Sequence, residues 1–289
     1  MPWDRATVHV WSDAFQRAAS VFEGIRAYWD GPTKKYSFLA WDAHMKRLGQ
    51  SARLAALVQP HRPEDLFAHT AALLEELGYE EDVYIRPTFY QPDRDDPPGA
   101  GCFIPIFQSP RSPTIETGVT CMISTWRRPH DTDVPPRVKA AANYYASRLG
   151  RLEAQSSGRD EALFLNRDGR VAETGGAAVF IVRDGVVSTP SITESVLESI
   201  TRSLVIELLL AEGVPVVERP IDRTELYIAD EVFLAGTLAE ITPVTRIDRF
   251  EVGHGVRGQR TAVLQASYSQ LCHGTLPGFE RWTTPLSIG

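Results

Sequence analysis

Strand-like and helix-like segments alternate along this chain, and turns typical of β-hairpins occur among them. The pairs Asp168-Gly169 and Asp184-Gly185 each separate two apolar runs, and such pairs favour tight turns between antiparallel strands. A doubly wound parallel sheet would instead have a helix between nearly all of its strands. The frequent hairpins among helices therefore predict an α+β fold with mixed sheets.

Apolar residues recur at helical spacing in four stretches. The first predicted helix has Asp42 as its N-cap and places Met45, Leu48, Ala52 and Ala55 on one face. The second helix begins at Pro63 and ends at Gly78, because proline suits the first helical turn and glycine suits the end. The remaining two helices are expected over 141–155 and over 200–212, the last one stopped by Gly213.

The predicted strands cover 20–28 (with a turn), 36–40, 82–90, 102–107, 119–125, 162–165, 214–218 and 231–234. A loop rich in proline and aspartate is expected at 91–101. The segment 108–118 combines two prolines and two serines with no apolar periodicity, as linkers between domains do. We therefore expect a small N-terminal domain over 1–109, an interdomain linker over 110–117 and a large C-terminal domain over 118–289.

Composition excludes several classes of protein. Hydrophobic residues make up 43% of the 289 residues, and no apolar run approaches the ~20 residues that span a bilayer. The formal net charge of −7 disfavours nucleic acid as a partner, since phosphate binding needs a basic face. Three scattered cysteines, Cys102, Cys121 and Cys272, are too few for a disulfide framework or a zinc site. The N-terminal stretch 1–11 lacks the apolar core of a secretory signal. A cytoplasmic enzyme without a metal is expected.

Lysine is scarce in this chain, which has 26 arginines and only 4 lysines. Lys139 is the only lysine after Lys46. An arginine cannot form a Schiff base at neutral pH, because its guanidinium stays protonated. Lys139 is therefore a candidate for chemistry that arginine cannot perform.

Five residues are informative as a set, although each of them alone has an ordinary structural explanation. Lys139 could be a solvated lysine, Glu173 a turn acid, Thr201 a helix cap, Thr237 part of a plain turn and Arg47 a surface charge. An aldehyde cofactor needs a lysine to bind it covalently and a carboxylate to keep its pyridine nitrogen protonated. Its phosphate needs a cation and backbone N–H groups, such as those at a helix start. These five residues supply that set.

At this point the sequence resembles a known family. It is similar to the fold-type IV pyridoxal-phosphate aminotransferases, and among them to the branched-chain amino acid aminotransferases. The matching stretches are SVFEGIRAY at 20–28, HMKRL at 44–48, YIRP at 84–87, KAAANY at 139–144, ESITR at 198–202 and LYIADEVFLAGTLAEITPV at 226–244. The resemblance implies a small α/β sandwich domain and a larger pseudo-barrel α/β domain.

The resemblance also implies a role for each residue that matches a motif. Lys139 matches the lysine that binds pyridoxal phosphate and moves the proton of the substrate. Glu173 matches the acid paired with the pyridine nitrogen, and Tyr144 matches the tyrosine at the phenolic oxygen of the cofactor. The residues that match the phosphate site are Arg47, Ile200, Thr201 and Thr237.

For the substrate, the resemblance implies a wall formed by the small domain and a turn that receives the carboxylate group. The wall residues are Phe22, Gly24, Arg26, Tyr84 and Arg86, and the turn is Thr237-Leu238-Ala239. The family's sites lie between the two domains and are completed across a homodimer. A homodimer or higher homo-oligomer is therefore expected, with small amino acids and 2-oxo acids as the other partners.

The sequence departs from the family pattern at three positions. Ala178 stands where the family has an asparagine after the catalytic glutamate, and Ala142 stands where it has a glycine. Arg17 replaces a tyrosine near the substrate pocket, so it is either a pocket residue that favours a distal anionic group or a surface arginine. The family also has a strand or two before the segment that begins near Val8, so this chain either has a shortened small domain or starts late.

The leading hypothesis is transamination between a branched-chain or related amino acid and a 2-oxo acid, with glutamate and 2-oxoglutarate as one pair. A second hypothesis is a sister activity of the fold: D-amino acid transaminase, R-selective amine transaminase or aminodeoxychorismate lyase. A third is a non-catalytic amino-acid-binding descendant, against which the retained Lys139 argues.

Overall fold

The described residues, 1–92 and 101–288 of a computed structural model, form two compact units. Unit 1 comprises Met1–Ser109, Val138–Ala142 and Pro285–Gly289, and unit 2 comprises Pro110–Arg137 and Asn143–Thr284. This division differs from the domain ranges predicted from the sequence. It assigns 110–117 to unit 2 rather than to a separate linker, and it assigns 138–142 to unit 1. Most of the predicted loop at 91–101 lies outside the described residues.

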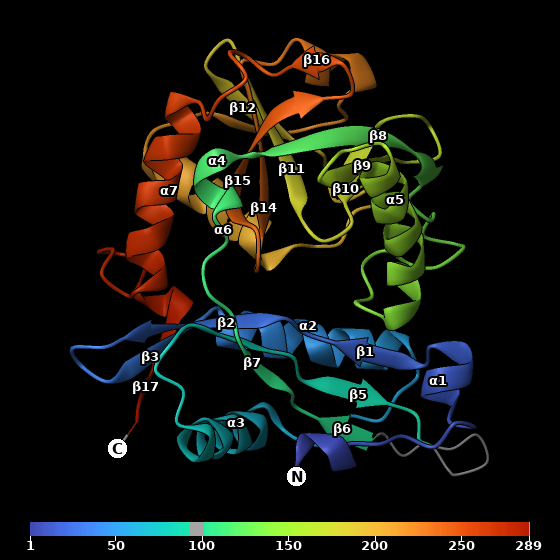
Figure 1. Cartoon of the computed structure of the whole chain (residues 1–289), viewed down its shortest axis with the longest axis vertical. Helices are drawn as coiled ribbons and strands as arrows, with labels where there is room; N and C mark the ends of the chain where they lie inside the picture. Colours follow the sequence, from blue (N-terminus) through green and yellow to red (C-terminus); the bar gives the residue numbers. More distant parts are fainter. Residues whose placement is uncertain (93–100, 289) are drawn as a thin grey trace. The chain divides into compact units, whose positions relative to one another are not determined.

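Unit 1 contains short strands and two long helices (Figure 1). Its elements are η1 (Trp3–Arg5), α1 (Asp13–Arg17), β1 (Ser20–Phe22), β2 (Ile25–Asp30), β3 (Lys35–Leu39), α2 (Trp41–Leu54), α3 (Pro63–Leu77), β4 (Val83–Ile85), β5 (Thr88–Tyr90), β6 (Gly101–Phe103) and β7 (Ile106–Gln108). The C-terminal strand β17 (Thr283–Ser287) pairs with β3, so the last residues of the chain join this N-terminal sheet.

The described strands of unit 1 form two sheets, in the orders β1-β5-β6 and β17-β3-β2-β4-β7. The predictions of one strand at 82–90 and one at 102–107 are wrong, because each segment contains two strands that belong to different sheets. Pro87 and Pro105 stand at these breaks, where a residue without an N–H cannot continue a ladder. The expected strand and turn at 20–28 divides in the same way, at Glu23-Gly24.

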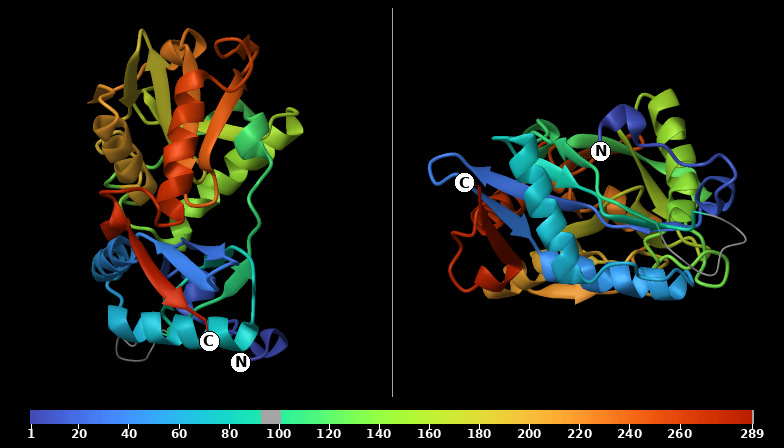
Figure 2. Two further views of the ribbon diagram at one scale, coloured as in Figure 1. Left: turned by 90° about the vertical axis from the view of Figure 1, so that its left-hand side faces the viewer. Right: turned by 90° about the horizontal axis from the view of Figure 1, so that it is seen from below.

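Helices α2 and α3 lie beside the strands of unit 1 (Figure 2), and they share an apolar core with these strands. Met45 and Leu48 of α2 and Leu66 and Leu74 of α3 belong to this core. The prediction for α3 is confirmed at both ends. Asp42 is not the N-cap of α2, because the N-cap is Ala40, with a left-handed φ of 54°. The reversal at Ala40 moves Asp42 into the first turn, where the helix dipole favours its charge.

Unit 2 contains one large sheet and several helices. Its elements are α4 (Thr114–Thr117), β8 (Val119–Arg127), α5 (Tyr144–Ser156), β9 (Glu161–Leu165), β10 (Val171–Thr174), β11 (Ala178–Arg183), β12 (Val186–Thr189), α6 (Ile200–Ala211), β13 (Val216–Glu218), η3 (Arg223–Tyr227), β14 (Glu231–Gly236), β15 (Glu240–Ile247), β16 (Phe250–Glu251), α7 (Gln259–Cys272) and η4 (Glu280–Trp282). A further turn of helix, η2 (Ala141–Asn143), begins in unit 1 and leads into α5.

The large sheet closes on itself. Its strands follow the order β10-β9-β8-β15-β14-β11, and β11 pairs again with β10. Parallel pairs (β8 with β9 and with β15) occur beside antiparallel ones, so the sheet is mixed, and the predicted α+β pseudo-barrel is confirmed. The predicted hairpins at Asp168-Gly169 and Asp184-Gly185 are also confirmed, since they join β9 to β10 and β11 to β12.

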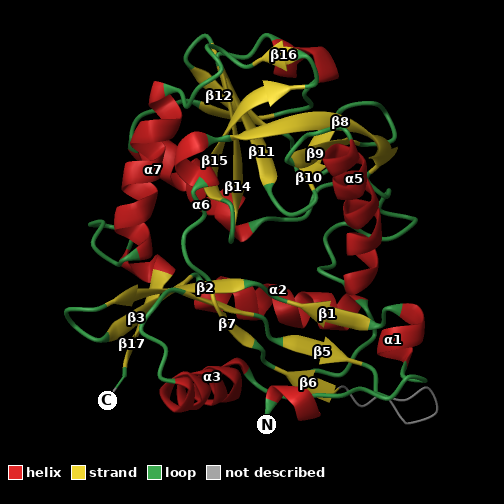
Figure 3. Ribbon diagram, viewed as in Figure 1, coloured by secondary structure: helices red, strands yellow, loops and turns green. Residues whose placement is uncertain are grey.

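Helices α5, α6 and α7 pack on the outside of this closed sheet (Figure 3), with α5 along β8 and β9, and α6 and α7 beside β14 and β15. The predicted helices at 141–155 and 200–212 are thus present as α5 and α6, whereas α7 was not predicted. No helix among the described residues is long and apolar enough to cross a membrane.

Candidate active site

The predicted wall residues of unit 1 lie where its two sheets meet. Three segments cross from one sheet to the other at this junction, and backbone hydrogen bonds tie the crossings together. Glu23 N–H donates to Pro87 O at 3.0 Å, and Arg86 N–H donates to Pro105 O at 3.0 Å. The two prolines that break the strands therefore also supply the carbonyl groups that fix the junction.

Phe22 connects two cationic side chains at this junction. The Arg86 guanidinium lies 3.7 Å from the centre of the Phe22 ring, and Lys139 Nζ lies 5.1 Å from it. The backbone of Lys139 is fixed as well, because its carbonyl accepts from Phe22 N–H at 3.0 Å and its N–H donates to Ser51 Oγ at 3.1 Å. Ala140 bridges Val21, so residues 138–142 belong to unit 1 as an added edge of β1.

Gly24 and Tyr84 depend on each other. A Cβ atom at Gly24 would lie 2.3 Å from the Tyr84 hydroxyl oxygen, so only glycine leaves room for this phenol. Arg26 pairs with Tyr84 across β2 and β4, but its guanidinium is buried and engaged. It donates to Ser109 O at 2.8 Å and to Asp82 at 3.3 Å. These contacts connect Arg26 of β2 to Ser109, the last residue of the N-terminal segment of unit 1.

Arg47 takes part in a buried ion pair that sequence reasoning missed. Its Nε and Nη2 atoms each donate to Glu23 at 2.7 Å, and His44 Nδ1 lies 2.7 Å from the same carboxylate. Burial tends to raise the pKa of Glu23, but the charge and hydrogen bonds of Arg47, followed by those of His44, hold this pKa well below its usual range. Burial lowers the pKa of His44 despite the neighbouring carboxylate.

Arg17 lies on α1, with its side chain 49% exposed and in an ion pair with Asp13 one turn earlier. These contacts support the surface-arginine alternative of the sequence analysis. A pocket role for Arg17 has no support among them.

In unit 2, two groups from other parts of the chain contact the carboxylate of Glu173 in β10. Arg128, directly after β8, reaches Glu173 Oε1 with Nη2 at 2.7 Å. The N–H of Leu197, in the loop before α6, donates to the same oxygen at 3.0 Å. Arg128 also donates to Ser147 of α5 and to Ser195 O. Glu173 and Arg128 are both buried, so this ion pair fixes the position of the carboxylate within the unit.

Helix α6 begins at Ile200, as predicted, but Thr201 is not its cap. The N-cap is Ser199, whose hydroxyl accepts from Arg202 N–H. The first amides of an α-helix have no acceptor within the helix, so those of Ile200 and Thr201 are suited to an anion. Tyr144 is the half-buried first residue of α5.

Thr237, Leu238 and Ala239 form the connection between β14 and β15, in which Gly236 pairs with Glu240. Leu238 is exposed, whereas Gly236 is tightly packed, because a Cβ atom there would lie 2.9 Å from Gly176 O. The turn therefore has a fixed base and an accessible tip.

The structure divides the predicted site residues between the units. Unit 1 carries Phe22, Gly24, Arg26, Arg47, Tyr84, Arg86 and Lys139, and unit 2 carries Tyr144, Glu173, Ile200, Thr201, Thr237, Leu238 and Ala239. Ala178 stands where the family has an asparagine. It is the β11 residue directly opposite Glu173 of β10, so an apolar methyl group lies opposite this acid.

Sequence reasoning missed Glu23, His44 and Arg128. For Glu23 a signal was present, because an acid interrupts the apolar run SVFEGIRAY, and His44 and Arg47 share a helix face at a spacing of three residues. For Arg128 no local signal exists, because its partner is on a distant strand and Arg127-Arg128 reads as a surface pair.

Comparisons with known proteins all lead to the same family. Residues 20–247 match the family model described as amino-transferase class IV. The probable branched-chain-amino-acid aminotransferase of Aquifex aeolicus is 39% identical over 292 residues, with 99% of this chain and 94% of the relative covered.

Solved structures agree with this chain over almost its whole length. The branched-chain amino acid aminotransferase from Thermobaculum terrenum in its PLP (holo) form matches with a TM-score of 0.91 and 38% identity, covering 100% of this chain and 95% of the other. A branched-chain amino acid aminotransferase from T.th., complexed with N-(5'-phosphopyridoxyl)-L-glutamate, matches with a TM-score of 0.92 and 33% identity, covering 98% and 95%.

Proposed function

Because the chain belongs to the amino-transferase class IV family, we propose that it transfers the amino group between a branched-chain amino acid and a 2-oxo acid. Pyridoxal 5'-phosphate is its cofactor, and glutamate with 2-oxoglutarate is the partner pair. The relatives named as branched-chain aminotransferases support the substrate class, and the T.th. complex with a phosphopyridoxyl-glutamate adduct supports the partner.

One observation carries the proposal. The only lysine after Lys46 has its backbone hydrogen-bonded to β1 and α2 and its ammonium group over the ring of Phe22. A solvated surface lysine needs no such support. Lys139 supplies the amine that binds the cofactor aldehyde and moves the proton that leaves the substrate Cα.

The donor set fits pyridoxal phosphate. When bound, this group supplies an aldehyde for covalent attachment and a ring that accepts electron density from the substrate. Glu173 would hold the proton of the pyridine nitrogen, and its carboxylate is positioned by Arg128 and the Leu197 N–H. Tyr144 would contact the phenolic oxygen. The sister activities of this fold have less support, since the similar proteins reported above are named branched-chain aminotransferases.

The phosphate is bound mainly by N–H groups in this proposal. Ile200 and Thr201 offer their N–H groups at the N-terminus of α6, and Thr237 offers its N–H group at the start of the β14–β15 turn. Arg47 is the cation, oriented by its two hydrogen bonds to Glu23. For the substrate, the residues 237–239 receive the carboxylate, and Phe22, Gly24, Tyr84 and Arg86 line the side-chain pocket, with Arg26 supporting them from within unit 1.

Borohydride reduction tests the role of Lys139. The purified protein should be yellow, lose its visible absorbance on reduction and carry the cofactor on the peptide that contains Lys139. Lys139→Ala should remove turnover almost wholly and leave no reducible adduct. A labelled adduct on Lys46 instead would contradict the assignment.

A half-reaction screen tests the substrate class. Leucine, isoleucine, valine and glutamate should each discharge the cofactor absorbance of the enzyme when no 2-oxo acid is present, and their D-enantiomers and 1-phenylethylamine should not. Faster reaction with D-alanine or with the amine than with leucine would favour a sister activity.

A homodimer and a cytoplasmic location complete the proposal. Sedimentation equilibrium should give about twice the chain mass of 32.1 kDa, and cell fractionation should recover the protein in the cytoplasm. A monomer that is fully active would contradict a pocket completed by a second copy.

A further inference from the structure

The turn proposed to receive the substrate carboxylate ends on an unusual residue. Glu240, the first residue of β15, has a φ of 45°. This left-handed region favours glycine or asparagine and is strained for other residues. Glu240 is nonetheless 3% exposed and in register opposite Gly236. The contacts of its buried side chain therefore help to hold the residue at the end of the turn.

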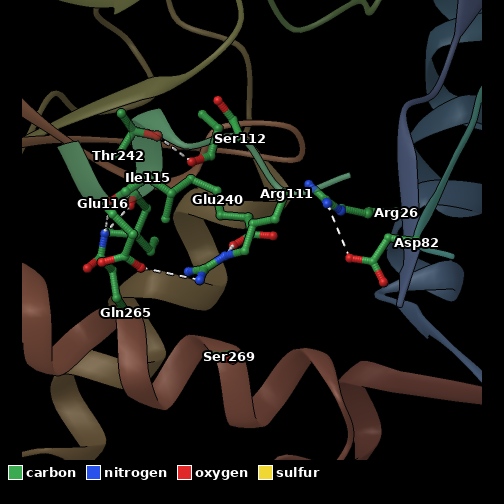
Figure 4. A network of polar contacts seen from close by, with 12 residues as sticks. Arg26, Asp82, Arg111, Ser112, Ile115, Glu116, Glu240, Thr242, Gln265 and Ser269 are labelled. Carbon is green, nitrogen blue, oxygen red and sulfur yellow. Dashed lines mark hydrogen bonds and ion pairs between the residues drawn. The ribbon is translucent and has the colours of Figure 1, made fainter. Parts of the chain in front are cut away.

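Arg111 supplies such an interaction (Figure 4). Its Nε donates to Glu240 Oε2 at 2.9 Å, and its Nη1 lies 3.3 Å from Glu116 Oε1 in α4. The Glu240 side chain is 4% exposed, whereas Arg111 is 42% exposed and Glu116 is 53% exposed. One guanidinium therefore contacts a buried carboxylate at the end of the turn and an exposed carboxylate on α4.

The neighbours of Glu240 are fixed by neutral hydrogen bonds. The Thr242 hydroxyl donates to Ala239 O at 2.6 Å. Gln265 of α7 donates to Ile241 O at 2.8 Å and to Ile115 O at 2.6 Å. The carbonyl groups on both sides of Glu240 are thus held, and the charged pair with Arg111 holds the side chain of the residue itself.

We infer that Arg111 and Glu240 are positioning residues for carboxylate recognition: their ion pair holds the backbone of 237–239 in the geometry that binds the α-carboxylate of the substrate. The inference rests on the proposed function. It adds two residues that touch neither cofactor nor substrate. It also gives the segment after Ser109, expected to be a plain linker, a part in substrate binding.

The size of the effect follows from the geometry. Loss of the Arg111 guanidinium removes a charged partner from the buried Glu240 carboxylate, which is unfavourable, and the strained φ of Glu240 then relaxes together with the turn. A misplacement of about 1 Å in a positioning group can lower kcat/KM by up to ~100-fold, and here the loss falls on KM because the turn binds the substrate carboxylate. We expect Glu240→Gln and Arg111→Gln each to raise KM for leucine and for 4-methyl-2-oxopentanoate by about tenfold. The kcat at saturation should stay within about twofold, because Lys139 and Glu173 are untouched.

Glu116→Gln is the matched control, since Glu116 also contacts Arg111 but is an exposed residue of α4 and not a residue of the turn. Its KM values should equal those of the wild type. The double variant Arg111→Gln/Glu240→Gln should be no worse than the poorer single variant, because both remove the same contact. Cofactor absorbance, cofactor retention on dialysis and the melting temperature are recorded for every variant, so that loss of the fold or the cofactor is recognised.

Three outcomes would overturn the inference. The first is an unchanged KM in both single variants of an active enzyme. The second is an equal rise in Glu116→Gln, and the third is a fall in kcat or in cofactor retention with KM unchanged. A wild type that transaminates no amino acid refutes the proposed function, and with it this inference. A working wild type with unaltered variants refutes this inference alone.

Discussion

Three of the four glutamates that are buried in the described part of the chain, Glu23, Glu173 and Glu240, lie against arginine side chains, whereas Glu194 accepts a hydrogen bond from Asn166. Glu23 is paired with Arg47, and Glu173 with Arg128, in each case at 2.7 Å. A guanidinium presents several donors in a rigid fork, so it can both compensate and orient a carboxylate. These pairs differ from exposed ones such as Arg17 with Asp13, which contribute little to stability. Arg47 and Arg128 therefore serve to hold buried acids in place.

Glu23→Gln should be strongly destabilising. The substitution leaves the buried Arg47 guanidinium without its countercharge, which typically costs about 3–5 kcal/mol of unfolding free energy. Urea unfolding of wild type and variant at pH 7 measures the difference. Asp65→Asn is the control, because it removes one partner of an exposed ion pair with Arg62 and should leave the urea midpoint unchanged.

The pH dependence of that difference has a defined sign. The pKa of Glu23 is lower in the folded state than its ordinary value of 4.5, so the folded state favours the charged form. The stability contributed by Glu23 is therefore fully present above pH ~4.5 and is lost as the pH falls below it toward the folded pKa. The gap between wild type and Glu23→Gln should shrink below pH ~4.5. A gap that widens there would contradict this account.

At the scale of single elements, glycines decide how closely helices approach strands. Gly150 lies on α5, which packs on β9, and Gly49 lies on α2. Both are in helices, where glycine is disfavoured by up to ~1 kcal/mol relative to alanine. A Cβ atom at Gly150 would lie 2.3 Å from Cζ of the fully buried Phe164. The α5–β9 contact therefore requires glycine, whereas at Gly49 the neighbour is the exposed Gln59.

Gly150→Ala should therefore destabilise the protein by about 1–3 kcal/mol, since the Phe164 ring must shift inside a packed core. Gly49→Ala should be neutral or stabilising, because the Gln59 side chain can move away. Thermal and urea unfolding of the two variants measure the contrast. Equal stability of the two variants would show that α5 can move outward at no cost.

At the scale of the whole molecule, the residues proposed to hold the cofactor are distributed over both units. Lys139 and Arg47 belong to unit 1, and Glu173, Thr201 and Thr237 belong to unit 2. A ligand that binds only the folded chain raises the free energy of unfolding, by about 2.7 kcal/mol when its concentration is 100 times Kd. Cofactor binding should thus stabilise the entire protein and not one unit alone.

Removal and return of the cofactor test this expectation. Protein freed of cofactor should melt at a lower temperature in calorimetry, and pyridoxal 5'-phosphate should restore the melting temperature. Pyridoxal, which lacks the phosphate, should raise the melting temperature less, because it has no group to bind the α6 N-terminus and Arg47. Equal rescue by both compounds would mean that those groups bind no phosphate.

The sequence by itself determined the family and several of the elements. Local signals are sufficient for such features: Pro63 and Gly78 mark the ends of α3, and Asp-Gly pairs mark two hairpins, because backbone preferences act within a few residues. A long motif such as LYIADEVFLAGTLAEITPV identifies a family without any knowledge of contacts. The same local signals also placed Lys139 before a helix.

Only the tertiary structure decided which charges meet. The partners of Glu23, Glu173 and Glu240 come from other elements of the chain, so no spacing in the sequence connects them. Likewise, Pro87 and Pro105 are evident in the sequence. Their position between strands of different sheets is not, because it depends on hydrogen bonds between distant segments of the chain. Burial and ion pairing are properties of three-dimensional neighbours, and for that reason the supports of the site became visible only in the fold.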